Sequence, residues 1–219
     1  MKRNRAALTA WISGLLFAVL IILVRFVDVQ AIGPESTRIG LSSLNRFAFE
    51  TLGVHMLWYE TTDWLGIAAI GTALLFAVTG LVQWVKRRSL WKVDKEILAL
   101  GGLYLIVIGL YVLFELVIVN YRPIPMPGSI HPEASFPSSH TMLVCVIMGS
   151  AMLLLGKYVR GKTLRTVLRA LCAAIIAITV IGRLISGVHW FTDIIGGILI
   201  SVMLLNLYAA VLERIENNE

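Results

Sequence analysis

The run ILALGGLYLIVIGLYVLFELVIV, residues 97–119, decides the fold class of this protein, and Glu115 is its only charged residue. A helix needs about 20 mostly apolar residues to cross the hydrocarbon core of a bilayer. The apolar surface of such a run exceeds what a small soluble globule can hide. The run therefore predicts a membrane-spanning helix with one carboxylate near its end.

The rest of the chain shows the same pattern. Of its 219 residues, 58% are hydrophobic and 15% are charged, whereas a soluble domain carries about 25% charge. Six apolar runs are long enough to span a bilayer: residues 6–23, 65–85, 97–119, 141–159, 168–185 and 192–212. The first run could belong to a signal peptide, but it is longer than the apolar core of one, so we expect a retained helix. We expect one all-α domain over residues 1–219, an integral-membrane bundle of six helices.

Basic residues orient this bundle, because Lys and Arg gather on the cytoplasmic side of a membrane. One side collects every lysine: Lys2, Arg3, Arg5, Lys86, Arg87, Arg88, Lys92, Lys95, Lys157, Arg160, Lys162, Arg165, Arg169 and Arg214. The other side keeps only arginines: Arg25, Arg38, Arg46, Arg122 and Arg183. We expect both termini in the cytoplasm. The net charge of +6 is interpreted as a topology signal, and no nucleic-acid partner is expected.

Two outer segments differ in character. Residues 28–64 contain LSSLNRFAFETL, with Leu44, Phe47 and Leu52 at near-helical spacing, which predicts a short interfacial helix; a plain loop is the alternative. The segment before the fourth span holds five of the six prolines: Pro123, Pro125, Pro127, Pro132 and Pro137. Proline fixes φ and removes a donor, so this connection is expected to be stiff and non-helical.

The stretch ASFPSSHTM, residues 134–142, places polar side chains where the fourth span begins. Polar residues at the mouth of a bundle are costly and usually face a cavity. Ser138 is a good N-cap, and the free N–H groups beyond it, beginning near Ser139, suit a phosphate. His140 lies in the first turn and can carry a proton near neutral pH. An ordinary N-cap beside a chance histidine is the simpler alternative.

A second stretch, IGRLISGVHWFTD at residues 181–193, lies on the same side. His189 and Asp193 are four residues apart and would share a helix face. A carboxylate beside an imidazole fixes its tautomer and leaves the other nitrogen as a nucleophile or base. A structural hydrogen bond at a helix start explains the pair equally well. Gly187 can end the preceding helix, so that Arg183 and His189 meet across a bend.

These pieces together predict a phosphoryl-transfer site. Arg122 and Arg183 could grip an anion through their forked guanidinium groups, with the helix N-terminus beside them. The arginines outnumber the acidic groups and would repel a cation, so we expect no metal and no cofactor. Cys145 and Cys172 lie in apolar runs and are interpreted as small buried hydrophobes.

At these residues the chain resembles the integral-membrane lipid phosphatases of the type-2 phosphatidic acid phosphatase superfamily. That family carries three motifs, K-x6-R-P, P-S-G-H and S-R-x5-H-x3-D. The first is kept here as Arg122-Pro123, and the second reads Pro137-Ser138-Ser139-His140. The third reads Gly182-Arg183, then His189 and Asp193 at the family spacing. The resemblance also covers the six-span layout.

The resemblance implies a mechanism and a location. His189 would attack phosphorus and form a phosphohistidine supported by Asp193, and His140 would protonate the leaving group and then activate water. Phosphoryl oxygens would be held by Arg122, Arg183, Ser138 and the Ser139 backbone. The partners would be a lipid phosphate and membrane lipids, without a metal, at the outer face of a bacterial plasma membrane.

Three positions depart from the family pattern: Glu115 stands at the motif lysine, Ser139 at a glycine and Gly182 at a serine. Glu115 could pair with an outer arginine or contact a substrate hydroxyl. It lowers the positive charge of the site, which favours a monophosphate and hence conversion of phosphatidylglycerophosphate to phosphatidylglycerol. An outer site also suits an undecaprenyl diphosphate phosphatase, the alternative. A transporter or lipid-binding protein that keeps only an anion site is the non-enzymatic alternative. Vanadate-dependent haloperoxidases have a similar oxyanion pocket but are soluble.

Overall fold

The computed structural model describes residues 2–126, 128–129 and 131–218, with side chains from residue 5 onward. The side chains of Lys2 and Arg3, and Pro127 of the proline-rich connection, therefore lie outside the described residues. The α-helices are α1 (Lys2–Phe26), α2 (Ser42–Leu52), α3 (Met56–Arg87), α4 (Lys95–Leu116), α5 (Ser139–Tyr158), α6 (Lys162–Ile185) and α7 (Phe191–Glu216).

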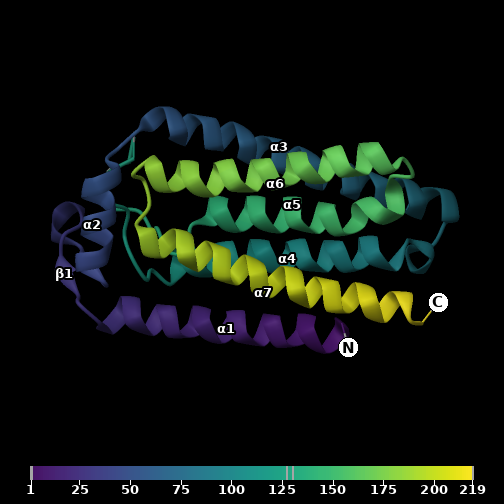
Figure 1. The fold of residues 1–219 in the computed structure, drawn as a ribbon, viewed down its shortest axis with the longest axis horizontal. Helices are drawn as coiled ribbons and strands as arrows, with labels where there is room; N and C mark the ends of the chain where they lie inside the picture. Colours follow the sequence, from purple (N-terminus) through teal and green to yellow (C-terminus); the bar gives the residue numbers. More distant parts are fainter. Residues whose placement is uncertain (1, 127, 130, 219) are drawn as a thin grey trace.

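The six long helices run side by side as one bundle, and α2 lies across the end opposite the two termini (Figure 1). Each of the six is long and apolar enough to cross a membrane. Large apolar side chains point outward along them, such as Trp11 at 80% exposed and Leu105 at 71%, which suits a surface covered by lipid. The predicted all-α membrane bundle is confirmed.

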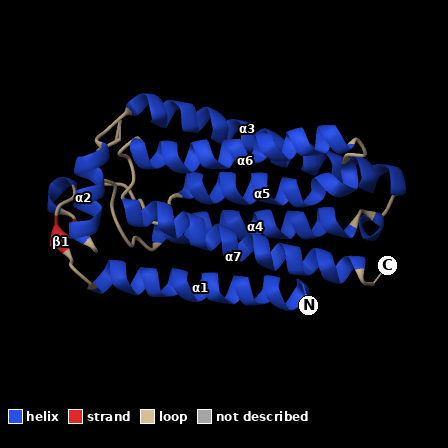
Figure 2. Ribbon diagram, viewed as in Figure 1, coloured by secondary structure: helices blue, strands red, loops and turns tan. Residues whose placement is uncertain are grey.

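The bundle is packed around α5. A larger share of its residues is buried inside the bundle than in any other span. Its Met142, Val146 and Leu154 pack in one core with residues from α1, α4 and α7. The short elements sit in the connections (Figure 2): the antiparallel pair β1 (Gln30–Ala31) and β2 (Arg38–Ile39), and the 3-10 turns η1 (Pro34–Ser36) and η2 (Leu90–Lys92). Cys145 and Cys172 are free and buried, as predicted.

The first outer segment forms the predicted short helix, α2, and the plain-loop alternative is wrong. Phe47 is 69% exposed on its outer face, whereas Asn45 is fully buried on the inner face. The Asn45 amide donates to Thr192 Oγ1 at 3.0 Å and accepts from the Thr192 N–H at 3.1 Å. These bonds fasten α2 to the start of α7.

The second span begins earlier than the hydropathy predicts, at Met56 rather than at residue 65. The segment ETTD, residues 60–63, interrupts the apolar run but continues the helix. The Thr62 hydroxyl donates to the Trp58 carbonyl at 2.8 Å, so this polar group is satisfied without leaving the helix. Likewise, α6 begins at Lys162 rather than at residue 168, because basic side chains at a helix end can reach the interface.

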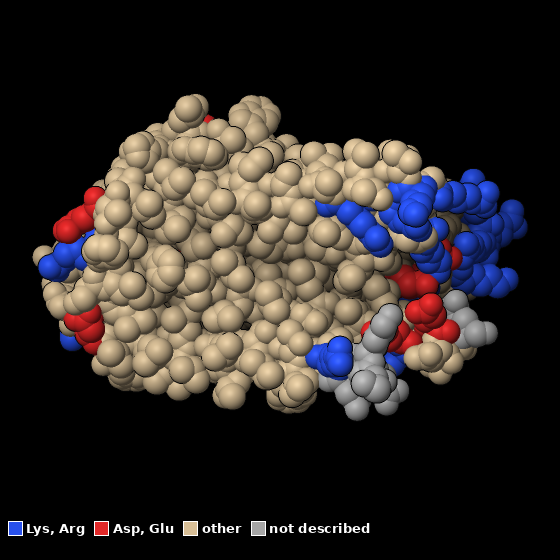
Figure 3. Space-filling model, viewed as in Figure 1, with Lys and Arg blue, Asp and Glu red and all other residues tan. Residues whose placement is uncertain are grey.

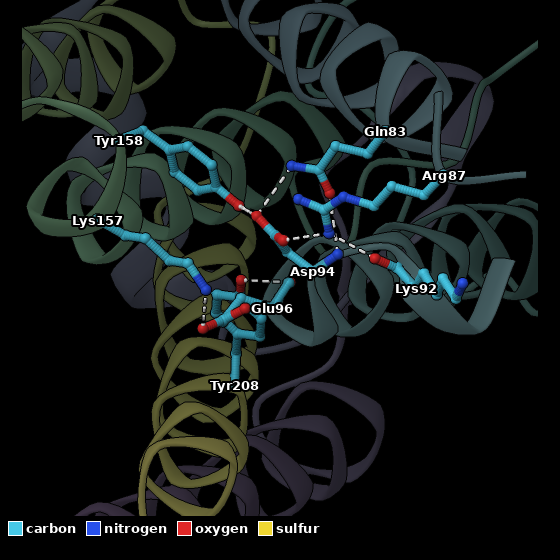
Figure 4. A network of polar contacts seen from close by, with 8 residues as sticks. All are labelled: Gln83, Arg87, Lys92, Asp94, Glu96, Lys157, Tyr158 and Tyr208. Atoms are coloured by element: carbon cyan, nitrogen blue, oxygen red, sulfur yellow. Dashed lines mark hydrogen bonds and ion pairs between the residues drawn. The ribbon is translucent and has the colours of Figure 1, made fainter. Parts of the chain in front are cut away.

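Lysine and arginine side chains gather at the end of the bundle that carries both termini (Figure 3). We call this the basic end. The opposite end, which contains α2 and the connections 117–138 and 186–190, is called the motif end. At the basic end, Asp94 accepts hydrogen bonds from Arg87, Gln83 and Tyr158 (Figure 4). Burial opposes ionisation of Asp94, but these bonds outweigh it and lower the pKa of its carboxyl. The network ties the α3–α4 connection to α5.

Candidate functional site

Segments far apart in the sequence meet at the motif end through backbone hydrogen bonds. The Ser138 N–H donates to the Asp193 carbonyl at 3.0 Å, which joins the start of α5 to the first turn of α7. The Trp190 indole donates to the Tyr121 carbonyl at 2.7 Å. The sequence-predicted residues of all three motif segments therefore lie around one place.

The start of α5 has the N-cap that the sequence predicts. Ser138 is the N-cap, and its hydroxyl accepts from the Thr141 N–H at 3.4 Å. Because the hydroxyl oxygen is the acceptor in this bond, its own proton stays free to donate. Ser139 is the first helical residue, and N–H groups of a first turn have no partner within the helix.

His189 and Asp193 meet, although not as a pair on one helix face. Helix α6 ends at Ile185, Gly187 adopts φ +73°, and α7 begins only at Phe191. Asp193 Oδ2 accepts from the Trp190 N–H at 2.9 Å and lies 3.6 Å from His189 Nδ1. Asp193 thus caps the start of α7, and its support of the imidazole in catalysis stays a prediction.

The His189 ring is buried, and neither of its nitrogens has a hydrogen-bond partner. The backbone of Ser135 lies near the ring. Burial, together with the positive charges of Arg122 and Arg183, holds the pKa of His189 well below its usual value. The imidazole is therefore neutral at physiological pH, which is the form that a nucleophile requires.

The two arginines present unpartnered donors to this space. Arg183 is fully buried, forms an ion pair with Asp63, and places its guanidinium carbon 4.7 Å from the centre of the Tyr59 ring. Its Nε has no hydrogen-bond partner. Arg122 Nε lies 3.1 Å from Glu133 Oε2, without hydrogen-bond geometry, and its buried Nη1 is unpartnered. Buried unpartnered guanidinium donors are rare and fit an anion that carries several oxygens.

The neighbours of these arginines were missed from sequence. Asp63 falls in the outer segment 28–64 of the sequence prediction, because the second span is expected to begin at residue 65. A backward extension of that helix to Met56 places a carboxylate within a spanning helix, which is a recognised sign of function. The Arg122 N–H donates to the Glu133 carbonyl at 3.0 Å and closes a hairpin. The side chains of Arg122 and Glu133 pair across this hairpin. A proline-rich connection carries no periodic signal from which that pairing could be read.

Glu115 lines a small cavity together with Ser139 and His189, so it belongs to the surroundings of the site. Pairing with an outer arginine was one expectation for this residue. Among the described side chains, however, Glu115 has no ion pair, and Arg122 is paired with Glu133 instead. The other expectation, contact with a substrate hydroxyl, stays a prediction.

A larger cavity of about 490 Å³ begins at Asp63, Ser139 and His140 and continues between α3, α4 and α5. Its further lining is apolar and includes Ile67, Ile70, Val107, Ile108 and Leu143. Ile67 and Ile108 are also exposed on the lipid-facing surface. The polar site is therefore continuous with an apolar groove that opens sideways from the bundle.

Comparison with known proteins agrees with these observations. The PAP2 superfamily family model matches residues 68–216. Among solved structures, the fold is similar to a transmembrane PAP2-type phosphatidylglycerolphosphate phosphatase from Bacillus subtilis, with a TM-score of 0.63 and 18% sequence identity over 94% of this chain and 96% of that one. A search of curated protein sequences found no match. This chain is therefore a multi-pass membrane protein that belongs to the PAP2 superfamily.

Proposed function

We propose that this protein is a membrane lipid phosphatase that removes the terminal phosphate of a lipid phosphate through a phosphohistidine at His189. The observation that carries the proposal is the unpartnered, buried imidazole of His189 beside two arginines that also carry unpartnered donors. A site that only bound an anion would need the arginines and the helix N-terminus. It would have no use for a neutral nucleophile backed by a carboxylate.

The geometry supports a two-step displacement. Because Nδ1 of His189 faces Asp193, Nε2 attacks phosphorus while the bond from phosphorus to the lipid oxygen breaks. His140 gives its proton to that oxygen and releases the lipid alcohol. The same imidazole then takes a proton from water, which attacks the phosphohistidine and releases phosphate. Arg122, Arg183, Ser138 and the Ser139 N–H stabilise the charge that spreads over the phosphoryl oxygens.

The groove suggests how the substrate arrives. Its apolar walls fit acyl chains, and its lipid-facing side lets a lipid slide in from the bilayer with its headgroup at the motif end. We propose phosphatidylglycerophosphate as the substrate, because Glu115 near Ser139 and His189 disfavours the extra charge of a diphosphate. The basic end supports cytoplasmic termini and an outer site in a bacterial plasma membrane. That orientation keeps undecaprenyl diphosphate as the second candidate.

A substrate panel tests this proposal. Purified protein in detergent micelles is given short-chain phosphatidylglycerophosphate or undecaprenyl diphosphate, with and without EDTA, and phosphate release is measured. We expect turnover of both, faster with the monophosphate and unchanged by the chelator. A strong preference for the diphosphate would reverse the substrate assignment. Binding without phosphate release would favour a lipid-binding protein or transporter, and loss of turnover with EDTA would contradict the metal-independent mechanism.

Reversing the charge at Glu115 should change the choice between these lipids. We expect Glu115→Lys to raise the ratio of diphosphate to monophosphate turnover about tenfold, because the exchange removes a negative charge and adds a positive one at the rim, together worth about 1–1.5 kcal/mol at an exposed position. The ratio of kcat/KM for the two lipids is the measurement, and Glu60→Gln on the exposed face of α3 is the control. An unchanged ratio would make Glu115 a structural residue only.

A further inference from the structure

Asp63 lies outside the three motifs and outside the matched residues 68–216, yet it contacts two residues of the site. Its Oδ1 lies 3.1 Å from Nε2 of His140 and also forms an ion pair with Nη2 of Arg183. The side chain is 36% exposed and lines the apolar groove. A single carboxylate thus bridges the expected proton donor on α5 and the buried arginine on α6.

The surface of α3 is shaped around these contacts. Gly66 follows Asp63 by about one turn, and a Cβ at Gly66 would lie 3.3 Å from Cδ2 of His140. The edge of the imidazole therefore rests against bare backbone, and its position is limited by the backbone of α3 as well as by the contact of 3.1 Å with Asp63. A side chain at this position would press against the ring and require it to shift by a few tenths of an ångström.

Helix α6 approaches α3 equally closely beside Arg183. A Cβ at Gly182 would lie 2.6 Å from Cγ2 of Thr62 and 3.1 Å from Cε3 of Trp58. The serine found at this place in the family motif does not fit, which explains the departure at Gly182. The tight contact brings Arg183 under the Tyr59 ring and against Asp63.

The contacts have a chemical consequence for His140. With Nε2 held by Asp63, the imidazole leaves Nδ1 to face the substrate, and the carboxylate supports the positive charge that a proton donor carries. Asp63 also occupies Nη2 of Arg183 and leaves the unpartnered Nε for a phosphoryl oxygen. We propose that Asp63 is a positioning residue, which orients His140 as the acid for the leaving group. This inference rests on the proposed lipid phosphatase activity.

The test distinguishes a loss of proton donation to the leaving group from a general loss of activity caused by a disturbed structure. A lipid alcohol needs a proton as it departs, whereas p-nitrophenolate leaves without one. We expect Asp63→Asn to lower kcat/KM, which reports the transfer of phosphate to His189 and excludes the later hydrolysis shared by both substrates, about 100-fold with short-chain phosphatidylglycerophosphate but less than about tenfold with p-nitrophenyl phosphate. His140→Ala should show the same substrate dependence, and Asp63→Glu should restore part of the lipid turnover. Glu60→Gln, an acid-to-amide change on the same helix without a contact to the site, is the matched control.

Each outcome has a defined meaning. An equal loss with both substrates would overturn the proposal, since a purely structural role predicts it, and so would wild-type turnover in Asp63→Asn. Thermal unfolding in detergent shows whether the variant is folded; if it is not, Asp63→Glu carries the comparison, and an equal loss in that variant overturns the proposal. A wild-type protein that hydrolyses neither substrate would instead refute the phosphatase function itself.

Discussion

Replacing His189 by alanine is expected to lower kcat by at least about 10⁴-fold, because no other group can form the covalent intermediate. The fold should survive the change. Neither ring nitrogen of His189 makes a hydrogen bond, so truncation leaves no buried partner unsatisfied. The Asp193 carboxylate continues to accept the hydrogen bond of 2.9 Å from the Trp190 N–H at the start of α7. Phosphate release from phosphatidylglycerophosphate by purified protein measures the effect, with thermal unfolding in detergent as the check on folding.

The covalent step can be observed directly. Wild-type protein mixed briefly with lipid carrying a radiolabelled terminal phosphate and quenched in alkali should retain label, because a phosphohistidine survives base. His189→Ala should retain none. His131→Ala is the matched control, since His131 lies exposed in the proline-rich connection. Turnover by His189→Ala near the wild-type rate, or label retained by it, would reject His189 as the nucleophile.

Arg183→Lys has the second largest expected effect, a loss of about 10²–10³-fold in kcat/KM. A lysine keeps the positive charge beside Asp63, so this carboxylate is not left without a counter-ion. It cannot, however, bond Asp63 with one nitrogen and offer a second, fixed donor to the phosphoryl group, as the guanidinium does. Loss of one preorganised donor to a developing oxyanion costs about this much.

The control for this variant is Arg38→Lys, which makes the same exchange at an exposed residue of strand β2. We expect that change to leave kcat/KM within about twofold of wild type. Arg183→Lys should also lower kcat with the lipid and with p-nitrophenyl phosphate alike, because both pass through the same charged transition state. A loss smaller than about threefold would show that charge alone suffices at this position.

Much of the architecture is readable from local patterns. The six apolar runs predict six spans, because crossing a bilayer requires a continuous apolar length that hydropathy measures directly. The N-cap at Ser138 and the break at Gly187 are also local, since each depends on the chemistry of one residue beside a helix end. The basic loops predict the topology for the same reason. These features need no knowledge of what packs against what.

The surroundings of the site depend on packing between distant segments. Asp63 and Arg183 are separated by 120 residues, and no periodicity in either helix indicates that α3 and α6 touch there. The early start of α3 was hidden because a short polar segment lowers hydropathy, although the helix satisfies its own backbone and the bundle supplies partners for the side chains. Glu133 beside Arg122 and the absence of space at Gly182 likewise follow from how neighbouring segments meet. Local sequence thus determined which residues could react, whereas long-range packing decided which carboxylates pair with the arginines and with His140. The reason is that a contact between two helices depends on their distance in the folded protein, which no spacing along the chain specifies.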